Sequence, residues 1–213
     1  DRISSAMTFA SIKMMLLKRD KPYVFSELRY NFSALVVKGC GEPGLCRNSV
    51  HKLIGLLYTS FRMKKTGSEI IVKLLEMEGI SVVAGIPGGS ILPLYDALAK
   101  SSIRHVLARH EQGAGFIAQG MARSTGKPAV CFATSGPGAM NLLTAVADAR
   151  SDSVPIVAIT GQVNTSLIGT DAFQEADTFG LSFPIAKHSI MVQSPEELLR
   201  AIPEAFAIAI NGR

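Results

Sequence analysis

Residues 128–149 read PAVCFATSGPGAMNLLTAVADA, and they show the unit from which the fold is built. The near-continuous apolar run PAVCFATSG favours a strand buried on both faces, because a strand with one solvated face would alternate apolar and polar residues. The turn SGPG follows, and Pro137 suits the first position of a helix expected over about 138–150. A buried strand followed by a helix is typical of a parallel sheet with helices on both faces.

The same unit recurs from residue 63 onward. Helices are predicted over 66–78, 90–100 and 111–124 and after Ser194. The first has Thr66 and Glu69 at capping-box spacing. The further runs that predict strands are ISVVAGIPG (80–88), IRHVLARH (103–110), VPIVAITGQ (154–162) and PIAKHSIMV (184–192). The chain is therefore predicted to be an α/β protein with a mainly parallel sheet and helices on both faces.

Residues 1–62 lack this patterning, which predicts an irregular or disordered segment before a domain over 63–213. They hold ten of the 22 Lys and Arg but only four of the 17 Asp and Glu, so the net charge of +5 comes from this segment. A nucleic-acid partner would need a basic face on the folded part. We therefore expect no nucleic-acid partner.

Three interpretations of residues 1–62 stay open. The segment is poor in acidic residues and contains Ser and Arg, as a targeting segment for a plastid or another organelle would be. It could instead be a disordered or weakly folded arm. Finally, regular patterning begins at Met63, so Met63 could be the natural start and the earlier residues upstream translation. Without a targeting role, we expect a cytoplasmic protein.

The cysteines and apolar runs exclude several other classes. Cys40, Cys46 and Cys131 show neither a disulfide framework nor metal-ligand spacing, so no metal ligand is assigned in this chain. Cys131 lies in an apolar run and is expected to be a small buried hydrophobe. No uninterrupted apolar run approaches the roughly 18 residues that a membrane-spanning helix needs, and no membrane partner is expected.

Four turns fall where predicted strands end. They are GIPGGS (85–90), RHEQGAG (109–115), ATSGPGAMN (133–141) and TGQVN (160–164). In an open parallel sheet, ligands bind outside the carboxyl ends of the strands. Each turn alone is ordinary, and Glu111 alone could be a charge that favours a helix start. Together at one edge they predict a ligand site, although neither a phosphate-binding loop nor a GxGxxG fingerprint occurs.

The segments that carry a family resemblance are GIPGGSILPLYDAL, RHEQGAGFIAQGMAR, CFATSGPGAMNLLTAVADA, PIVAITGQV and IGTDAFQEAD. In order and spacing they resemble the amino-terminal, pyrimidine-binding domain of the thiamine-diphosphate enzymes. Within that superfamily they are most similar to the large catalytic subunits of the acetolactate (acetohydroxyacid) synthase family. The resemblance covers residues 63–213 and does not extend to residues 1–62.

The resemblance implies roles for individual residues. Glu111 would be the catalytic glutamate that hydrogen-bonds N1′ of the aminopyrimidine of thiamine diphosphate, and Phe173 and Gln174 would lie at the substrate edge. The residues that it implies for cofactor binding are Pro87, Gly88, Gly89, Glu111, Pro137, Asn141 and Gln174.

The implied reaction decarboxylates pyruvate and joins it to a second 2-keto acid, which gives acetolactate or acetohydroxybutyrate for branched-chain amino-acid synthesis. Mg²⁺ and FAD would be held by two further domains, since the Gly-Asp-Gly that marks the magnesium-binding domain is missing here. A second catalytic subunit would share the active site, and the resemblance allows a small regulatory subunit. We expect this chain alone to be inactive.

Three alternatives remain. The chain could belong to another thiamine-diphosphate decarboxylase, oxidase or carboligase, although FQEAD favours acetolactate synthase. It could be a non-catalytic fragment that pairs with a partner subunit. It could also be a doubly wound regulatory binding module, which would leave Glu111 unexplained.

Overall fold

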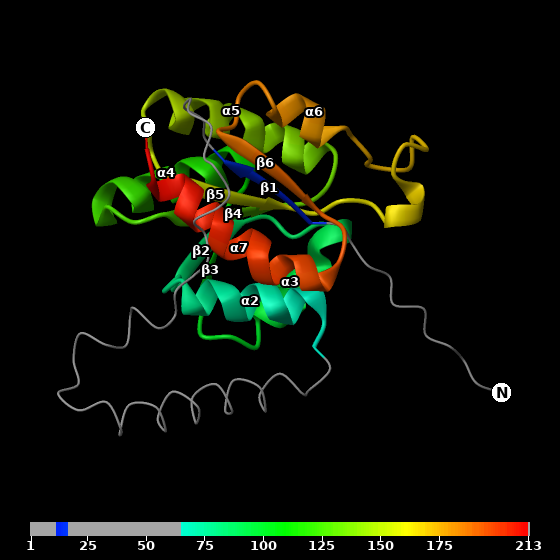
Figure 1. Ribbon diagram of the computed structural model, residues 1–213, viewed down its shortest axis with the longest axis horizontal. Helices are drawn as coiled ribbons and strands as arrows, with labels where there is room; N and C mark the ends of the chain where they lie inside the picture. Colours follow the sequence, from blue (N-terminus) through cyan, green and yellow to red (C-terminus); the bar gives the residue numbers. More distant parts are fainter. Residues whose placement is uncertain (1–11, 17–64, 213) are drawn as a thin grey trace, which may run out of the picture. The chain divides into compact units, whose positions relative to one another are not determined.

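The computed structural model describes residues 65–212, together with the backbone of residues 12–16. The strands form one sheet in the order β3-β2-β4-β5-β1-β6 (Figure 1). The pairs β2–β3, β2–β4 and β4–β5 are parallel, which confirms the predicted α/β fold with a mainly parallel sheet. The strands are β1 Ile12–Leu16, β2 Val82–Gly85, β3 Arg104–Leu107, β4 Ala129–Ala133, β5 Ile156–Thr160 and β6 His188–Val192.

One strand comes from the segment for which the sequence predicted no regular structure. β1 lies between β5 and β6 and runs antiparallel to both. Its place depends on hydrogen bonding to two distant strands, and local patterning does not show such partners. The rest of residues 1–62, with Cys40 and Cys46, lies outside the described residues, as does Met63. The three interpretations of this segment and the boundary at residue 63 stay predictions.

The helices begin where the capping residues predicted. The Thr66 hydroxyl accepts a hydrogen bond from Glu69 N, and the Glu69 carboxylate accepts one from Thr66 N, which completes the capping box of α2. Ser194 caps α7 in a similar way by accepting from Glu197 N. The helices are α2 Gly67–Met77, α3 Leu92–Leu98, α4 Glu111–Thr125, α5 Pro137–Ser151, α6 Thr178–Ser182 and α7 Pro195–Ile210, with short 3₁₀ turns η1 Gly89–Ile91 and η2 Thr165–Leu167.

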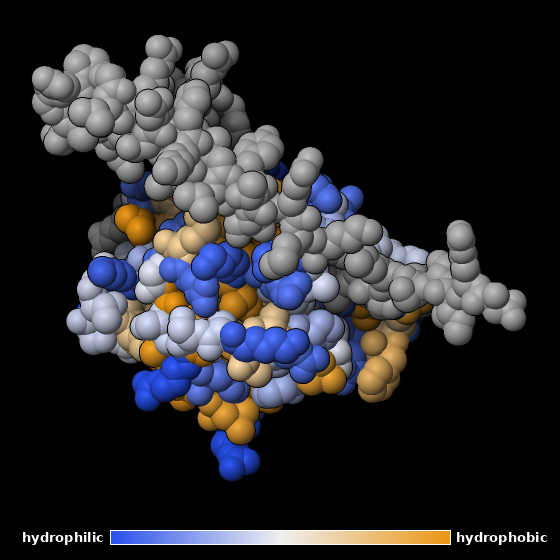
Figure 2. All heavy atoms as spheres, turned by 90° about the horizontal axis from the view of Figure 1, so that it is seen from below, coloured by the Kyte–Doolittle hydropathy of each residue, from blue (hydrophilic) through white to orange (hydrophobic). Residues whose placement is uncertain are grey.

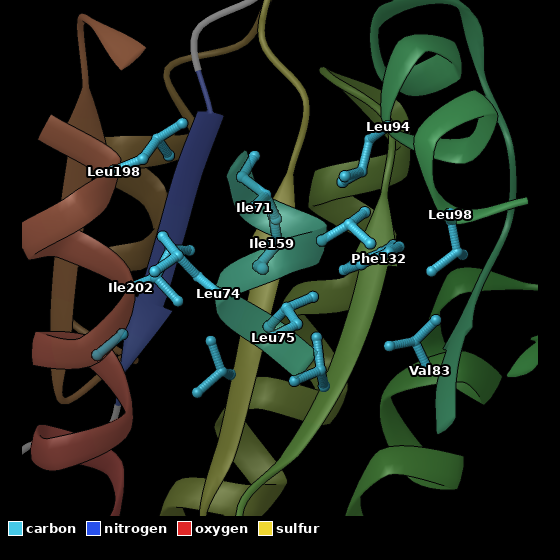
Figure 3. Close-up of a cluster of buried hydrophobic side chains, with 14 of the residues drawn as sticks. Ile71, Leu74, Leu75, Val83, Leu94, Leu98, Phe132, Ile159, Leu198 and Ile202 are labelled. Atoms are coloured by element: carbon cyan, nitrogen blue, oxygen red, sulfur yellow. The ribbon is translucent and has the colours of Figure 1, made fainter. Parts of the chain in front are cut away.

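The sheet separates two apolar clusters. We call the first the large-residue face; α2, α3 and α7 cover it, and helix side chains such as Leu75 pack there against strand side chains such as Phe132 (Figure 3). We call the second the small-residue face; α4 and α5 cover it, and most of its buried residues are alanines. Successive strand residues point to opposite faces. In β4, Val130 and Phe132 accordingly join the first cluster, whereas Ala129, Cys131 and Ala133 join the second.

The outer surface is mixed in character. Figure 2 shows the molecule from below relative to the view of Figure 1. On this face, hydrophilic and hydrophobic side chains are interspersed over the described residues. Among the described residues, no helix has the length and apolar character that a membrane crossing would require.

Candidate functional site

The turns predicted to cluster do meet at one edge of the sheet. The turn after β2 contacts the turn after β4, because the Ser90 hydroxyl lies 2.9 Å from the Thr134 hydroxyl and accepts a hydrogen bond from Ser135 N at 2.9 Å. The turn after β5 also joins them, since a Cβ added to Gly161 would overlap with Ser90. Parallel strands end at the same edge, so segments distant in the sequence converge there.

The Glu111 carboxylate lies at this edge as the first residue of α4. Asn141, in the first turns of α5, donates a hydrogen bond from Nδ2 to Glu111 Oε2 at 3.0 Å. The other oxygen, Oε1, faces Gly138, where an added Cβ would lie 3.4 Å from it. Among the described residues, no donor bonds Oε1. The site therefore presents a half-buried carboxylate with one oriented oxygen and one oxygen still able to accept a hydrogen bond.

The close approach of α4 and α5 brings Glu111 and Asn141 together. A Cβ added to Gly115 would overlap with the Ala145 Cβ, so the small residues let the two helix backbones approach. One turn further along α4, the buried Gln119 side chain donates from Nε2 to the Ala145 carbonyl at 2.8 Å. Glu111, Gly115 and Gln119 follow at intervals of four residues, which places them along one side of the helix. Sequence reasoning missed Gly115 and Gln119, although this spacing could have revealed them.

The glycines of the first turn have different surroundings. A Cβ added to Gly88 would lie 2.5 Å from the Thr134 Cβ, so Gly88 is required for the contact between the turns. Gly89 is exposed and has open space where a Cβ would be, and Pro87 and Pro137 are also exposed. The structure thus places Pro87, Gly89 and Pro137 on the accessible side of the edge.

Tyr95 adds a buried hydroxyl next to the first turn. Its ring stands edge-on to His105 and Phe132, with ring centroids 4.9 and 6.0 Å apart. The hydroxyl has no hydrogen-bond partner among the described residues. Burial, followed by the nearby Cys131 and Glu111 groups, raises the pKa of Tyr95 well above its usual value, so the hydroxyl stays protonated. Sequence reasoning read Tyr95 only as part of a helix.

The two residues predicted for the substrate edge differ in placement. The Gln174 backbone packs on the turn before α5, since a Cβ added to Gly136 would overlap with the Gln174 carbonyl oxygen. The Phe173 side chain points to solvent and is 88% exposed. The structure therefore brings Gln174 to the edge that contains Glu111 and Asn141, while Phe173 extends away from the described residues.

Cys131 is buried, as predicted, and burial raises the pKa of its thiol to about 12. The thiol therefore stays protonated and packs as a hydrophobe. In the described part of the chain, no three His, Cys, Asp or Glu residues are grouped as a metal site would require.

Comparison with known proteins covers the same part of the chain. Residues 65–181 match the family described as thiamine pyrophosphate enzyme, N-terminal TPP binding domain. The chain belongs to the thiamine pyrophosphate enzyme family. The match includes every residue that we predicted for the site, from Pro87 to Gln174.

Relatives of this thiamine pyrophosphate enzyme chain carry the name acetolactate synthase. The isozyme 1 large subunit of Escherichia coli K12 is 65% identical over 156 residues, which are 73% of this chain and 28% of that protein. The Corynebacterium glutamicum large subunit is 56% identical over 151 residues, 70% of this chain and 24% of that protein. A probable large subunit of Methanocaldococcus jannaschii is 52% identical over 147 residues, which are 69% of this chain and 25% of that protein. The chain spans about a quarter of these relatives.

The residues present fit the pyrimidine of thiamine pyrophosphate, which is also called thiamine diphosphate. A ring nitrogen that carries a proton needs an acceptor, and Glu111 Oε1 is such an acceptor at the end of the strands. Open space at Gly89 leaves room for a ligand beside the first turn. The sequence prediction that this domain binds the pyrimidine therefore agrees with both the chemistry and the family.

Proposed function

We propose that this chain forms the pyrimidine-binding part of an acetolactate synthase large subunit. The observation that carries the proposal is the Glu111 carboxylate at the strand ends, with Oε2 held by Asn141 and Oε1 available. Support also comes from the 52–65% identity to three relatives named as acetolactate synthases. A regulatory binding module of the same fold would give no reason for this carboxylate.

Glu111 would hold the pyrimidine of the cofactor through N1′, where it could accept and return a proton. The hydrogen bond from Asn141 holds one oxygen of the carboxylate, so Oε1 would be left to accept from the ring nitrogen. The backbone of Pro87, Gly88 and Gly89 would line the cofactor site, together with Pro137 and Asn141.

Thiamine diphosphate, when bound, supplies the electron sink that lets a 2-keto acid lose carbon dioxide and join a second 2-keto acid. Gln174 and Phe173 border the space for these keto acids, of which pyruvate is the donor. Their backbone comes from the loop that packs on Gly136, so substrate and cofactor positions are linked through one turn.

The remaining components are proposed to lie outside this chain. Mg²⁺ and FAD would be bound by other domains of the large subunit. A second catalytic subunit would complete the site at the edge where Glu111 is accessible. The name large subunit, which the relatives carry, also implies a small subunit as a partner.

The test replaces Glu111 with Gln in the complete enzyme that contains this domain. Glu111→Gln keeps the size of the side chain but cannot relay a proton, so acetolactate formation should fall by about a hundredfold to ten-thousandfold. Glu196→Gln, the same change at an exposed position on α7, should leave the rate unchanged. Urea unfolding of both variants would show that the fold survives. A near-normal rate for Glu111→Gln would refute the proposal.

A further inference from the structure

The loop that carries Phe173 and Gln174 has little regular structure of its own. Between β5 and α6, the only regular element among the described residues is the 3₁₀ turn η2. Two non-glycine residues of the loop adopt left-handed backbone conformations, Asp171 with φ of 55° and Gln174 with φ of 57°. Such conformations cost about 1 kcal/mol or more each and persist only when surrounding contacts enforce them. Some other interaction must therefore hold the loop in this shape.

The Glu175 carboxylate supplies that interaction. It accepts hydrogen bonds from the backbone N–H groups of Gly169, of Thr170 at 3.3 Å and of Ala172 at 3.1 Å. Its own N–H donates to the Ala172 carbonyl at 2.9 Å. One side chain therefore gathers the amides of a segment that has no strand partner, and hydrogen bonds to a charged acceptor are stronger than neutral ones.

The closed loop lies against the candidate site. Gln174, directly before Glu175, packs its carbonyl group on Gly136, and Gly136 is the N-cap of α5. Asn141 lies in the first turns of that same helix and bonds Glu111. The loop shape that Glu175 enforces thus decides where Gln174 meets the cofactor edge and in which direction Phe173 extends.

We propose that Glu175 is a positioning residue, which holds Phe173 and Gln174 at the substrate side of the edge that contains Glu111. The assignment of this edge as the substrate side depends on the proposed function, whereas the anchoring of the loop by Glu175 does not. Sequence reasoning gave Glu175 no role, because its partners are backbone amides and leave no pattern of side chains.

The charge of Glu175 is consistent with this role. The hydrogen bond from Gly169, with smaller contributions from Ala172 and Thr170, holds the pKa of the Glu175 carboxyl below its usual value despite some desolvation. The anchor is therefore present at neutral pH and lost as the pH falls through that lowered pKa. The nearby carboxylates are Asp171, in the same loop, and Asp177, which accepts from Gly180 N at the start of α6.

The first experiment measures amide hydrogen exchange by NMR in the chain of 213 residues. In the wild type, the amides of Gly169, Thr170 and Ala172 should be protected at neutral pH. Glu175→Gln should speed the exchange of at least one of these amides tenfold, since one acceptor oxygen becomes an NH2 group that cannot accept and the remaining oxygen carries no charge. Asp171→Asn is the matched control, because it removes a charge from the same loop and Asn tolerates the left-handed conformation. In Asp171→Asn, the amides of Gly169, Thr170 and Ala172 should stay protected. Unchanged protection in Glu175→Gln would overturn the anchor.

The second experiment measures keto-acid kinetics in the complete enzyme. Loss of positioning should raise KM for the keto acids at least tenfold in Glu175→Gln, with a smaller change in kcat, because Phe173 and Gln174 would bind substrate and transition state alike. Asp171→Asn should keep both constants. Faster exchange with an unchanged KM would overturn the positioning role. Retained activity in Glu111→Gln would overturn the proposed function alone, since the exchange result does not depend on the cofactor.

Discussion

The two faces of the sheet are packed from different residues. On the large-residue face, fully buried Ile, Leu and Phe side chains fill the space under α2, α3 and α7 (Figure 3). On the small-residue face, alanines and Gly115 let α4 and α5 approach the sheet and each other. Burial of large side chains contributes most to stability. Short side chains contribute less apolar area but allow a shorter distance between backbones.

The large-residue face mainly stabilises the fold, whereas the small-residue face also positions the residues of the candidate site. Glu111 and Asn141 come from the two helices of the small-residue face, and their 3.0 Å hydrogen bond depends on the contact between Gly115 and Ala145. No residue predicted for the site comes from α2 or α7, which supply many of the large side chains. The comparison therefore predicts that changes on one face alter the free energy of unfolding, and changes on the other also alter the site.

The largest expected effect is on the large-residue face. Leu75→Ala leaves a cavity under α2, so the free energy of unfolding should fall by about 2–5 kcal/mol. Urea unfolding measures the loss, and Met77→Ala, an exposed position on the same helix, should change it by less than about 0.5 kcal/mol. The NMR signals of the Asn141 side-chain amide should keep their wild-type positions. A shift of those signals in Leu75→Ala would break the separation of the two faces.

A smaller effect on stability, with a larger one on the site, is expected at Gly115. In Gly115→Ala, the new methyl group would overlap with Ala145 and force α4 from α5, at a cost of about 1–3 kcal/mol. Greater helix propensity offsets about 1 kcal/mol of this. Gly113→Ala, in the same helix with open space at its Cβ position, should instead stabilise the protein by about 0.5–1 kcal/mol.

The site should report the same displacement. The Asn141 amide signals should move in Gly115→Ala and stay in place in Gly113→Ala, because only the first variant separates the helices. Equal behaviour of the two variants would contradict the view that the small-residue face positions Glu111.

Local signals predicted the frame of the fold and the residues at its turns. The caps at Thr66 and Ser194 and the buried strand runs depend on neighbours in sequence, so they were predicted correctly. The convergence of the four turns followed from the geometry of parallel strands. The resemblance added the role of Glu111, which remains a prediction.

Long-range contacts explain what the sequence did not predict. β1 pairs with two strands more than a hundred residues away. Gln119 bonds a backbone carbonyl on α5, and Glu175 bonds backbone amides. Almost every residue carries the same backbone N–H and C=O groups. The sequence therefore does not show which backbone group a polar side chain will bond.

The smallest effect is expected on the surface of the large-residue face, at Glu76. Its carboxylate bonds Lys73 Nζ at 3.0 Å and the Ser102 hydroxyl at 3.3 Å. The hydrogen bond from Lys73, followed by smaller contributions from Ser102, holds the pKa of Glu76 below its usual value despite some desolvation. The stabilisation is therefore complete at neutral pH and lost as the pH falls through the lowered pKa.

Solvent screens this interaction, because Glu76 lies at the surface and the Lys73 side chain is 62% exposed. Glu76→Gln should lower the free energy of unfolding by less than about 0.5 kcal/mol at neutral pH. A double-mutant cycle with Lys73→Met, measured by urea unfolding, should assign about 0.2–0.5 kcal/mol to the pair, and added salt should reduce it. A coupling above about 1 kcal/mol would mean that surface charges rival a buried methylene in holding α2, and the stability of this face could no longer be attributed to its large side chains.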